Sequence, residues 1–120
     1  MASSKINYSL PEDTDAVIKK VLYKYVWPSN FSVAANGTGK VTAANFGFST
    51  PSGYTISGVG RYTAGSVHLL PYYVNPKATG SNSAIAFRNS TSSVQSGKTS
   101  YIEIIYIRST FINTHEYSNY

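Results

Sequence analysis

The chain has 120 residues, which is enough for one domain with its own hydrophobic core and too few for two. It contains no cysteine, so disulfides, thiolate zinc sites and cysteine nucleophiles are excluded. Charged residues make up only 12% of the chain and the net charge is +5, whereas 11 residues are tyrosine, a composition typical of β-sheets and recognition surfaces.

The N-terminal segment, residues 1–16, is polar and includes Pro11 and the acids Glu12, Asp13 and Asp15. We interpret it as a lead-in or linker. It has no apolar segment of the kind found in secretory signal peptides, and no run of the chain approaches the roughly 20 apolar residues that span a bilayer. We therefore expect no signal peptide and no insertion into a membrane.

Residues 17–27, VIKKVLYKYVW, predict the first strand. The apolar face at every second position consists of Val21, Tyr23, Tyr25 and Trp27. A helix capped by Asp15 is the alternative. The strand is favoured because β-branched and aromatic residues are poor helix formers, and because Pro28 ends the segment.

The next segments predict a hairpin. Residues 31–35 alternate in polarity and lead into Asn36-Gly37, a dipeptide typical of tight β-hairpin turns with positive φ. The following strand is predicted to run from Lys40 toward Phe48.

After a predicted turn at residues 51–53, three segments carry strand signals: residues 54–62, 66–74 and 83–89. Gly58 and Gly60 predict a bulge or a bend in the first of them. Pro71 cannot donate to a β-ladder, so it places the second at a sheet edge or at its own end. Residues 76–82 and 90–100 predict polar loops.

The last strand, residues 101–108, is apolar on both faces. One face carries Ile102, Ile104 and Tyr106, and the other carries Tyr101, Glu103, Ile105 and Ile107. Both faces should therefore be covered, one by the core and the other either by the same chain or by a neighbouring subunit. We expect Ile105 and Ile107 to lie at a subunit interface.

These signals together predict an all-β chain of about seven or eight short strands without a helix. The expected fold is a single, jelly-roll-like β-sandwich spanning residues 17–108, followed by a polar tail or arm at residues 109–120.

The residues offer little for catalysis or for metal binding. Of the five acids, Glu103 alone lies on a predicted strand, and the two histidines, His68 and His115, are isolated. This pattern fits neither a carboxylate pair nor a zinc or calcium site. We expect a protein that is not an enzyme and that uses no metal or cofactor. The ten basic residues are scattered, so no nucleic-acid partner is expected either.

Aromatic recognition remains as the expected activity. A sugar ring can stack its CH surface on an aromatic face while nearby polar groups bind its hydroxyls. The candidate ligand-binding residues lie in or near turns and a broken strand: Tyr54, Arg61, Tyr62, Tyr72 and Tyr73.

Several short segments follow one another in a familiar order. They are PSGYT at 51–55, VGRY at 59–62, IAFRN at 85–89 and IIYIR at 104–108. This order resembles the C-terminal head domains of phage and prophage tail fibres and minor tail proteins, and the opening segment SKINY resembles a junction between fibre and head. The resemblance implies a trimeric receptor-binding domain on the virion that adheres to a host-surface glycan or protein receptor. A monomeric bacterial carbohydrate-binding module is the alternative, and the mass in solution separates the two.

Changing Ile105 and Ile107 to Thr should give a folded, soluble monomer, because apolar patches of this kind are rarely left exposed on soluble monomers. Analytical ultracentrifugation of the wild type and the variant tests this expectation. A wild type that is already monomeric at high concentration would contradict the predicted interface, and much of the resemblance to a fibre with it.

Overall fold

The computed structural model describes residues 16–96 and 98–109. The predicted lead-in and tail therefore lie outside the described residues, apart from Ala16 and Ser109 at their borders. The described elements are β1 (Ile18–Val26), β2 (Ser32–Val33), β3 (Thr38–Thr42), α1 (Ala43–Phe46), β4 (Tyr54–Thr63), β5 (Leu69–Val74), β6 (Ser83–Asn89), β7 (Gln95–Ser96) and β8 (Thr99–Arg108).

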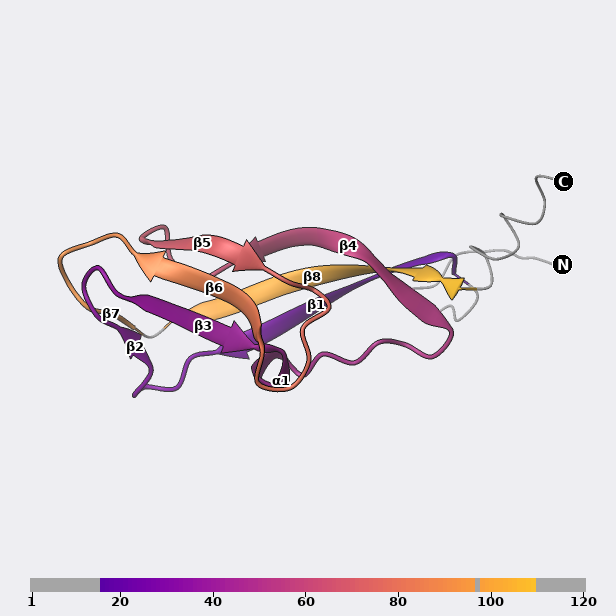
Figure 1. Cartoon of the computed structure of the whole chain (residues 1–120), viewed down its shortest axis with the longest axis horizontal. Coiled ribbons are helices and arrows are strands. Elements are labelled where there is room, and N and C mark those ends of the chain that lie inside the picture. Colours follow the sequence, from indigo (N-terminus) through magenta and orange to yellow (C-terminus); the bar gives the residue numbers. More distant parts are fainter. Residues whose placement is uncertain (1–15, 97, 110–120) are drawn as a thin grey trace, which may run out of the picture.

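The strands form an all-β sandwich (Figure 1). The front sheet has the order β3-β6-β5 and the back sheet has the order β1-β8-β4, with β2 and β7 forming a short two-stranded sheet at one end. All the pairings in the three sheets are antiparallel. The predicted fold class is therefore confirmed.

Strand β8 is the centre of the back sheet, between β1 and β4. Its inner face is fully buried at Ile102, Ile104 and Tyr106, as the alternation predicts. Its outer face, which includes Ile105 and Ile107, is only half-buried. Complete burial of one isoleucine stabilises a fold by roughly 1.5–3 kcal/mol, so the inner face of this strand is a major source of stability.

Trp27 joins the two sheets. Its indole stacks on Phe87 of β6 with the ring centroids 5.7 Å apart. Its Nε1–H donates to the Ser100 hydroxyl over 2.8 Å, and that hydroxyl donates to the Ala64 carbonyl oxygen, also over 2.8 Å. One buried side chain thereby ties the ends of β1, β4 and β8 to each other and to the opposite sheet.

Asn89 closes the end of the sandwich near β2 and β7. Its buried side-chain NH₂ donates to the carbonyl oxygens of Val33, Ala34 and Ser93 at distances of 2.7–3.2 Å. Its amide oxygen accepts from both the backbone N–H and the hydroxyl of Thr91. The Arg-Asn pair at the end of β6 therefore has a structural reason, since Asn89 satisfies backbone groups that β-pairing leaves unpaired.

The predicted hairpin at Asn36-Gly37 is wrong, although a turn is present there. Strand β2 pairs with β7 and β3 pairs with β6, so the strands that flank the turn belong to different sheets. The Gly37 N–H donates to the Ala34 carbonyl oxygen over 2.8 Å, and Asn36, with φ of 57°, is the left-handed residue while Gly37 is not. The strands on either side of the turn therefore pair with segments far away in the sequence and not with each other.

The strand predicted to run from Lys40 toward Phe48 stops at Thr42, where the short helix α1 begins. The Thr42 hydroxyl accepts from the Asn45 N–H over 3.0 Å, and the Asn45 side chain accepts from the Thr42 N–H over 3.1 Å. This reciprocal capping favours the helical turn over continued pairing, and Gly47, with φ of 72°, ends it. The expected all-β class holds, and α1 is a single helical turn within it.

The irregularities predicted by glycine and proline are confirmed. The register of β4 against β8 shifts between Ile56 and Gly58, and again between Val59 and Tyr62. Within the described chain β5 pairs with β6 alone, which makes it the edge strand expected from Pro71. The strand begins at Leu69, because residues 66–68 form a turn that is closed by a bond from the Leu69 N–H to the Ser66 carbonyl oxygen.

Gly65 should tolerate substitution least among the glycines with positive φ. With φ of 112°, a Cβ at this position would lie 2.7 Å from the Lys98 Cβ and 2.8 Å from the Thr99 carbonyl oxygen. We expect Gly65→Ala to lower the free energy of unfolding by about 2–3 kcal/mol. Gly53→Ala is the control, because Gly53 also has a positive φ, of 83°, but nothing lies within 4 Å of the place that a Cβ would take. We expect this variant to lose about 1 kcal/mol of unfolding free energy. Urea unfolding measures both, and equal losses would contradict the steric argument.

Candidate functional site

The candidate site lies over the connection between β5 and β6, residues 75–82. This connection is held by backbone bonds to α1: the Ala44 N–H donates to the Gly80 carbonyl oxygen over 2.9 Å, and the Ala43 N–H donates to the Asn82 carbonyl oxygen over 3.1 Å. Ala78 is buried in the core. The loop is therefore anchored at three points.

Asn75 positions the side chain of Tyr73 and the backbone of Lys77 at the site. Its side-chain NH₂ donates to the Tyr73 hydroxyl over 3.2 Å, and its side-chain oxygen accepts from the Lys77 N–H over 2.9 Å. Its own backbone N–H donates to the Ala84 carbonyl oxygen over 2.8 Å, which continues the pairing of β5 with β6 by one residue. The phenol of Tyr73 and the start of the loop are thus held by one amide side chain.

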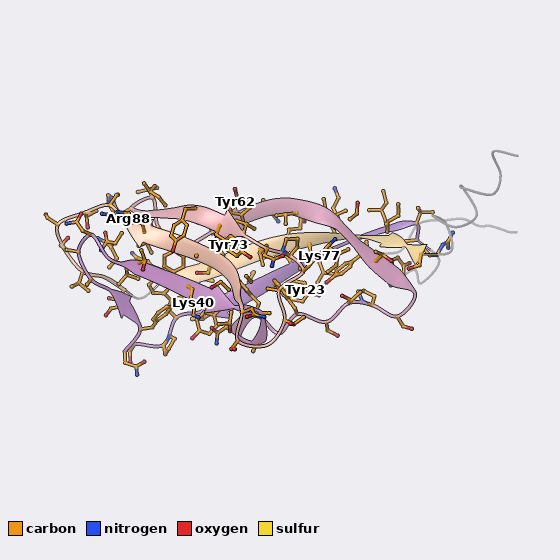
Figure 2. The ribbon with its side chains drawn as sticks, viewed as in Figure 1. Tyr23, Lys40, Tyr62, Tyr73, Lys77 and Arg88 are labelled. Carbon is orange, nitrogen blue, oxygen red and sulfur yellow. The ribbon has the colours of Figure 1, made fainter. Side chains whose placement is uncertain are left out.

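These elements surround a broad, open hollow of about 610 Å³. It is lined by Tyr72, Tyr73, Asn75, Lys77, Ala78, Thr79, Asn82, Ser83 and Ala86. Tyr72 is 64% exposed and Tyr73 is 48% exposed, so both rings are available to a ligand. Figure 2 shows Tyr73 on the front sheet and Lys77 beside the turn that follows β5. Aromatic faces beside amide, hydroxyl and ammonium groups are the combination that binds a polyhydroxylated ring.

A second, smaller hollow of about 220 Å³ lies between the same loop, α1 and the back sheet. It shares Lys77, Ala78 and Thr79 with the first hollow, and Tyr106 contributes to its wall. The Tyr106 hydroxyl lies 2.7 Å from the Tyr23 hydroxyl. Burial, followed by this hydrogen bond, raises the pKa of the Tyr106 phenol well above its ordinary value, so the group is neutral throughout the physiological range.

The structure brings two of the five predicted ligand-binding residues together. Tyr72 and Tyr73 both line the larger hollow. Tyr62 and Arg61 lie on β4 of the back sheet and do not line the larger hollow. Tyr62 is exposed, and the Arg61 guanidinium lies 5.9 Å from the centroid of the Tyr101 ring. Tyr54 is only 8% exposed and packs with Ile104 and Tyr106, so its proposed role in binding a surface ligand is incompatible with its position.

Sequence reasoning missed the polar residues of the hollow: Asn75, Lys77, Thr79 and Asn82. The segment was recognised as a polar loop, but nothing in its composition shows that it folds back beside Tyr73. The available signal was its position, since a polar loop follows a pair of tyrosines at a predicted strand end.

The described residues hold few groups suited to other chemistry. They contain no group of three or more histidine, aspartate or glutamate side chains that could hold a metal ion. Glu103 lies on the outer face of the back sheet, where a Cβ on Gly60 would collide with its carboxylate. Among these same residues no helix is long and apolar enough to cross a membrane.

No family model, curated protein or solved structure matches the chain. The fold is therefore described from its own strands and sheets, and the resemblance to phage tail-fibre heads remains an expectation from short segments. The geometry of the hollow is what supports a functional proposal.

Stability should fall at alkaline pH in a way that depends on Tyr106. An unfolded tyrosine has a pKa of about 10, and the folded pKa of Tyr106 is higher, so its stabilising contribution is complete below pH 10 and is lost as the pH rises toward the folded pKa. We expect Tyr106→Phe to remove up to about 1.4 kcal/mol per pH unit from the slope of unfolding free energy between pH 10 and 11.5. Identical slopes in the wild type and the variant would contradict the burial effect.

Proposed function

We propose that the protein binds a saccharide non-covalently in the hollow formed by Tyr72, Tyr73 and residues 75–82. The observation that carries the proposal is the exposed tyrosine pair, whose second phenol is held by Asn75 beside an anchored polar loop. An aromatic platform that is already positioned loses little conformational entropy when a ligand binds. A shallow, open hollow of this kind suits a chain end or a side branch of a glycan better than a small molecule that must be enclosed.

The proposal is one of adhesion rather than catalysis. The polar groups in the hollow are amides, hydroxyls and the Lys77 ammonium, and no described carboxylate lines it. Glycoside hydrolysis usually needs two carboxyl groups on opposite sides of the scissile bond. The hollow instead offers groups that accept and donate hydrogen bonds without transferring protons at neutral pH.

The biological setting we propose is the receptor-binding head of a phage tail fibre, acting on the virion at the host cell surface. The outer face of the back sheet supports assembly, because Ile18 of β1 is 55% exposed and pairs with Ile107 of β8, next to Ile105. A homotrimer would cover this stripe and would present three copies of the hollow. Avidity then makes weak single sites effective.

A monomeric bacterial carbohydrate-binding module is the second candidate. One observation favours it: Asn75 holds both the Tyr73 phenol and the Lys77 backbone by contacts within the same chain. The measured mass of the binding-competent protein distinguishes the two settings, while the proposed activity at the hollow is common to both.

The double variant Tyr72→Ala/Tyr73→Ala should lose glycan binding. A glycan array identifies a ligand for the wild type, and isothermal titration calorimetry then compares the variants. Loss of both aromatic faces should reduce the free energy of binding by about 2 kcal/mol, which corresponds to a roughly 30-fold weaker affinity. Tyr62→Ala is the matched control, because this tyrosine is similarly exposed but lies outside the hollow. Unchanged affinity in the double variant, with its fold intact by circular dichroism, would contradict the proposed site.

A further inference from the structure

Cations lie on both sheets of the sandwich, whereas the one described acid does not line the candidate hollow. Of the five acids, Glu103 is the one within the described residues, and it lies on the outer face of the back sheet. The outer side of the front sheet carries Lys40 and Arg88, and Lys77 extends the set into the loop beside it (Figure 2). The candidate hollow thus opens onto a face whose described charges are all positive.

The strand register connects one of these cations to the aromatic platform. Ala86 of β6 is paired with Tyr73 of β5 on one side and with Lys40 of β3 on the other. Neighbouring strands are about 4.8 Å apart, so the backbones at Tyr73 and Lys40 are separated by roughly 10 Å, with only the methyl group of Ala86 between them. The small side chain leaves a path over which the exposed Lys40 ammonium can reach a ligand that stacks on Tyr73.

Lys77 approaches the same platform from the opposite direction. It lines the hollow itself, and its backbone N–H is held by the Asn75 side chain. A ligand on Tyr73 therefore lies between Lys77 on the loop side and Lys40 on the sheet side. Arg88 lies farther along β6, paired with Leu70 and Thr38.

We infer that the ligand of this hollow is an acidic saccharide, in which a sugar ring stacks on Tyr72 and Tyr73 while its negatively charged groups bind Lys77 and Lys40. The inference rests on the proposed function and adds the charge class of the ligand. Its basis is charge complementarity: two ammonium groups flank the aromatic platform, and no described carboxylate lies in the hollow to neutralise them.

The arrangement favours a saccharide over a single-stranded nucleic acid. Nucleic-acid grooves combine stacking with a continuous series of cations that follows the phosphate backbone over several nucleotides. Here β5, which carries the tyrosines, has the sequence LLPYYV and contains no charged residue. The cations flank one platform and do not form a track.

Binding of three saccharide probes tests the inference: an oligogalacturonate, its carboxyl-reduced neutral form, and a neutral-sugar oligomer of matched length whose residues are joined by phosphodiesters. Calorimetry at 50 mM and 300 mM salt should show that the wild type binds at least one anionic probe about tenfold or more tightly than the neutral form, with an affinity that falls as salt rises. Whichever anionic probe binds identifies the source of the charge as carboxylate or phosphodiester.

The variants Lys77→Gln and Lys40→Gln should each weaken binding of the anionic probe about three- to tenfold, and Lys40→Gln, which lies outside the lining of the hollow, should leave binding of the neutral form unchanged. Lys24→Gln is the matched control, because this lysine is exposed on β1 of the back sheet and should have no effect. Equal loss in the control would show a non-specific charge effect and would overturn the inference.

The other possible results distinguish failure of the inference from failure of the proposed function. If the neutral form binds as tightly as the anionic probes, and binding is lost in Tyr72→Ala/Tyr73→Ala, the inference fails while the proposed function stands. If no saccharide binds, both fail together. If a single-stranded oligonucleotide of matched charge binds more tightly than every saccharide, the nucleic-acid alternative replaces the inference.

Discussion

The contact between Trp27 and Phe87 is the interaction on which the rest of the structure depends. The two main sheets have three strands each, and the apolar residues of both meet in one core. The Trp27 indole provides a large apolar surface across the gap, and its N–H is satisfied by Ser100, which in turn bonds to Ala64. The aromatic stack therefore sets the spacing of the sheets, and the hydrogen bonds set where the strands of the back sheet end.

The candidate site follows from that arrangement. Once β6 is fixed by Phe87 and closed by Asn89, its partner β5 lies at the edge, where exposed tyrosines cost little because no further strand must pack there. The connection between β5 and β6 is then anchored by buried Ala78 and by its bonds to α1. A surface held in this way can present aromatic rings and polar groups in one conformation, and that preorganisation is what an adhesion site needs.

The strand content and most strand positions followed from local patterns. Alternation predicted the inner faces of β1 and β8, and glycine and proline predicted the irregularities of β4 and the edge position of β5. The same local reasoning failed at Asn36-Gly37, because a dipeptide indicates a turn but does not determine which strands pair across it. It also placed Tyr54 at the surface, since a tyrosine beside a turn has the same sequence signature whether its ring is exposed or buried.

By itself the sequence determined the fold class and the alternation of its main strands, because these depend on side-chain chemistry and on the period of a β-strand. Only the tertiary structure decided that Tyr72 and Tyr73, rather than Tyr62 or Arg61, share a hollow with residues 75–82. Only the register across β5, β6 and β3 decided that Lys40 and Tyr73 pair with the same residue, Ala86. The physical reason is that both facts depend on contacts between segments far apart in the chain, which are selected by the packing of the whole sandwich.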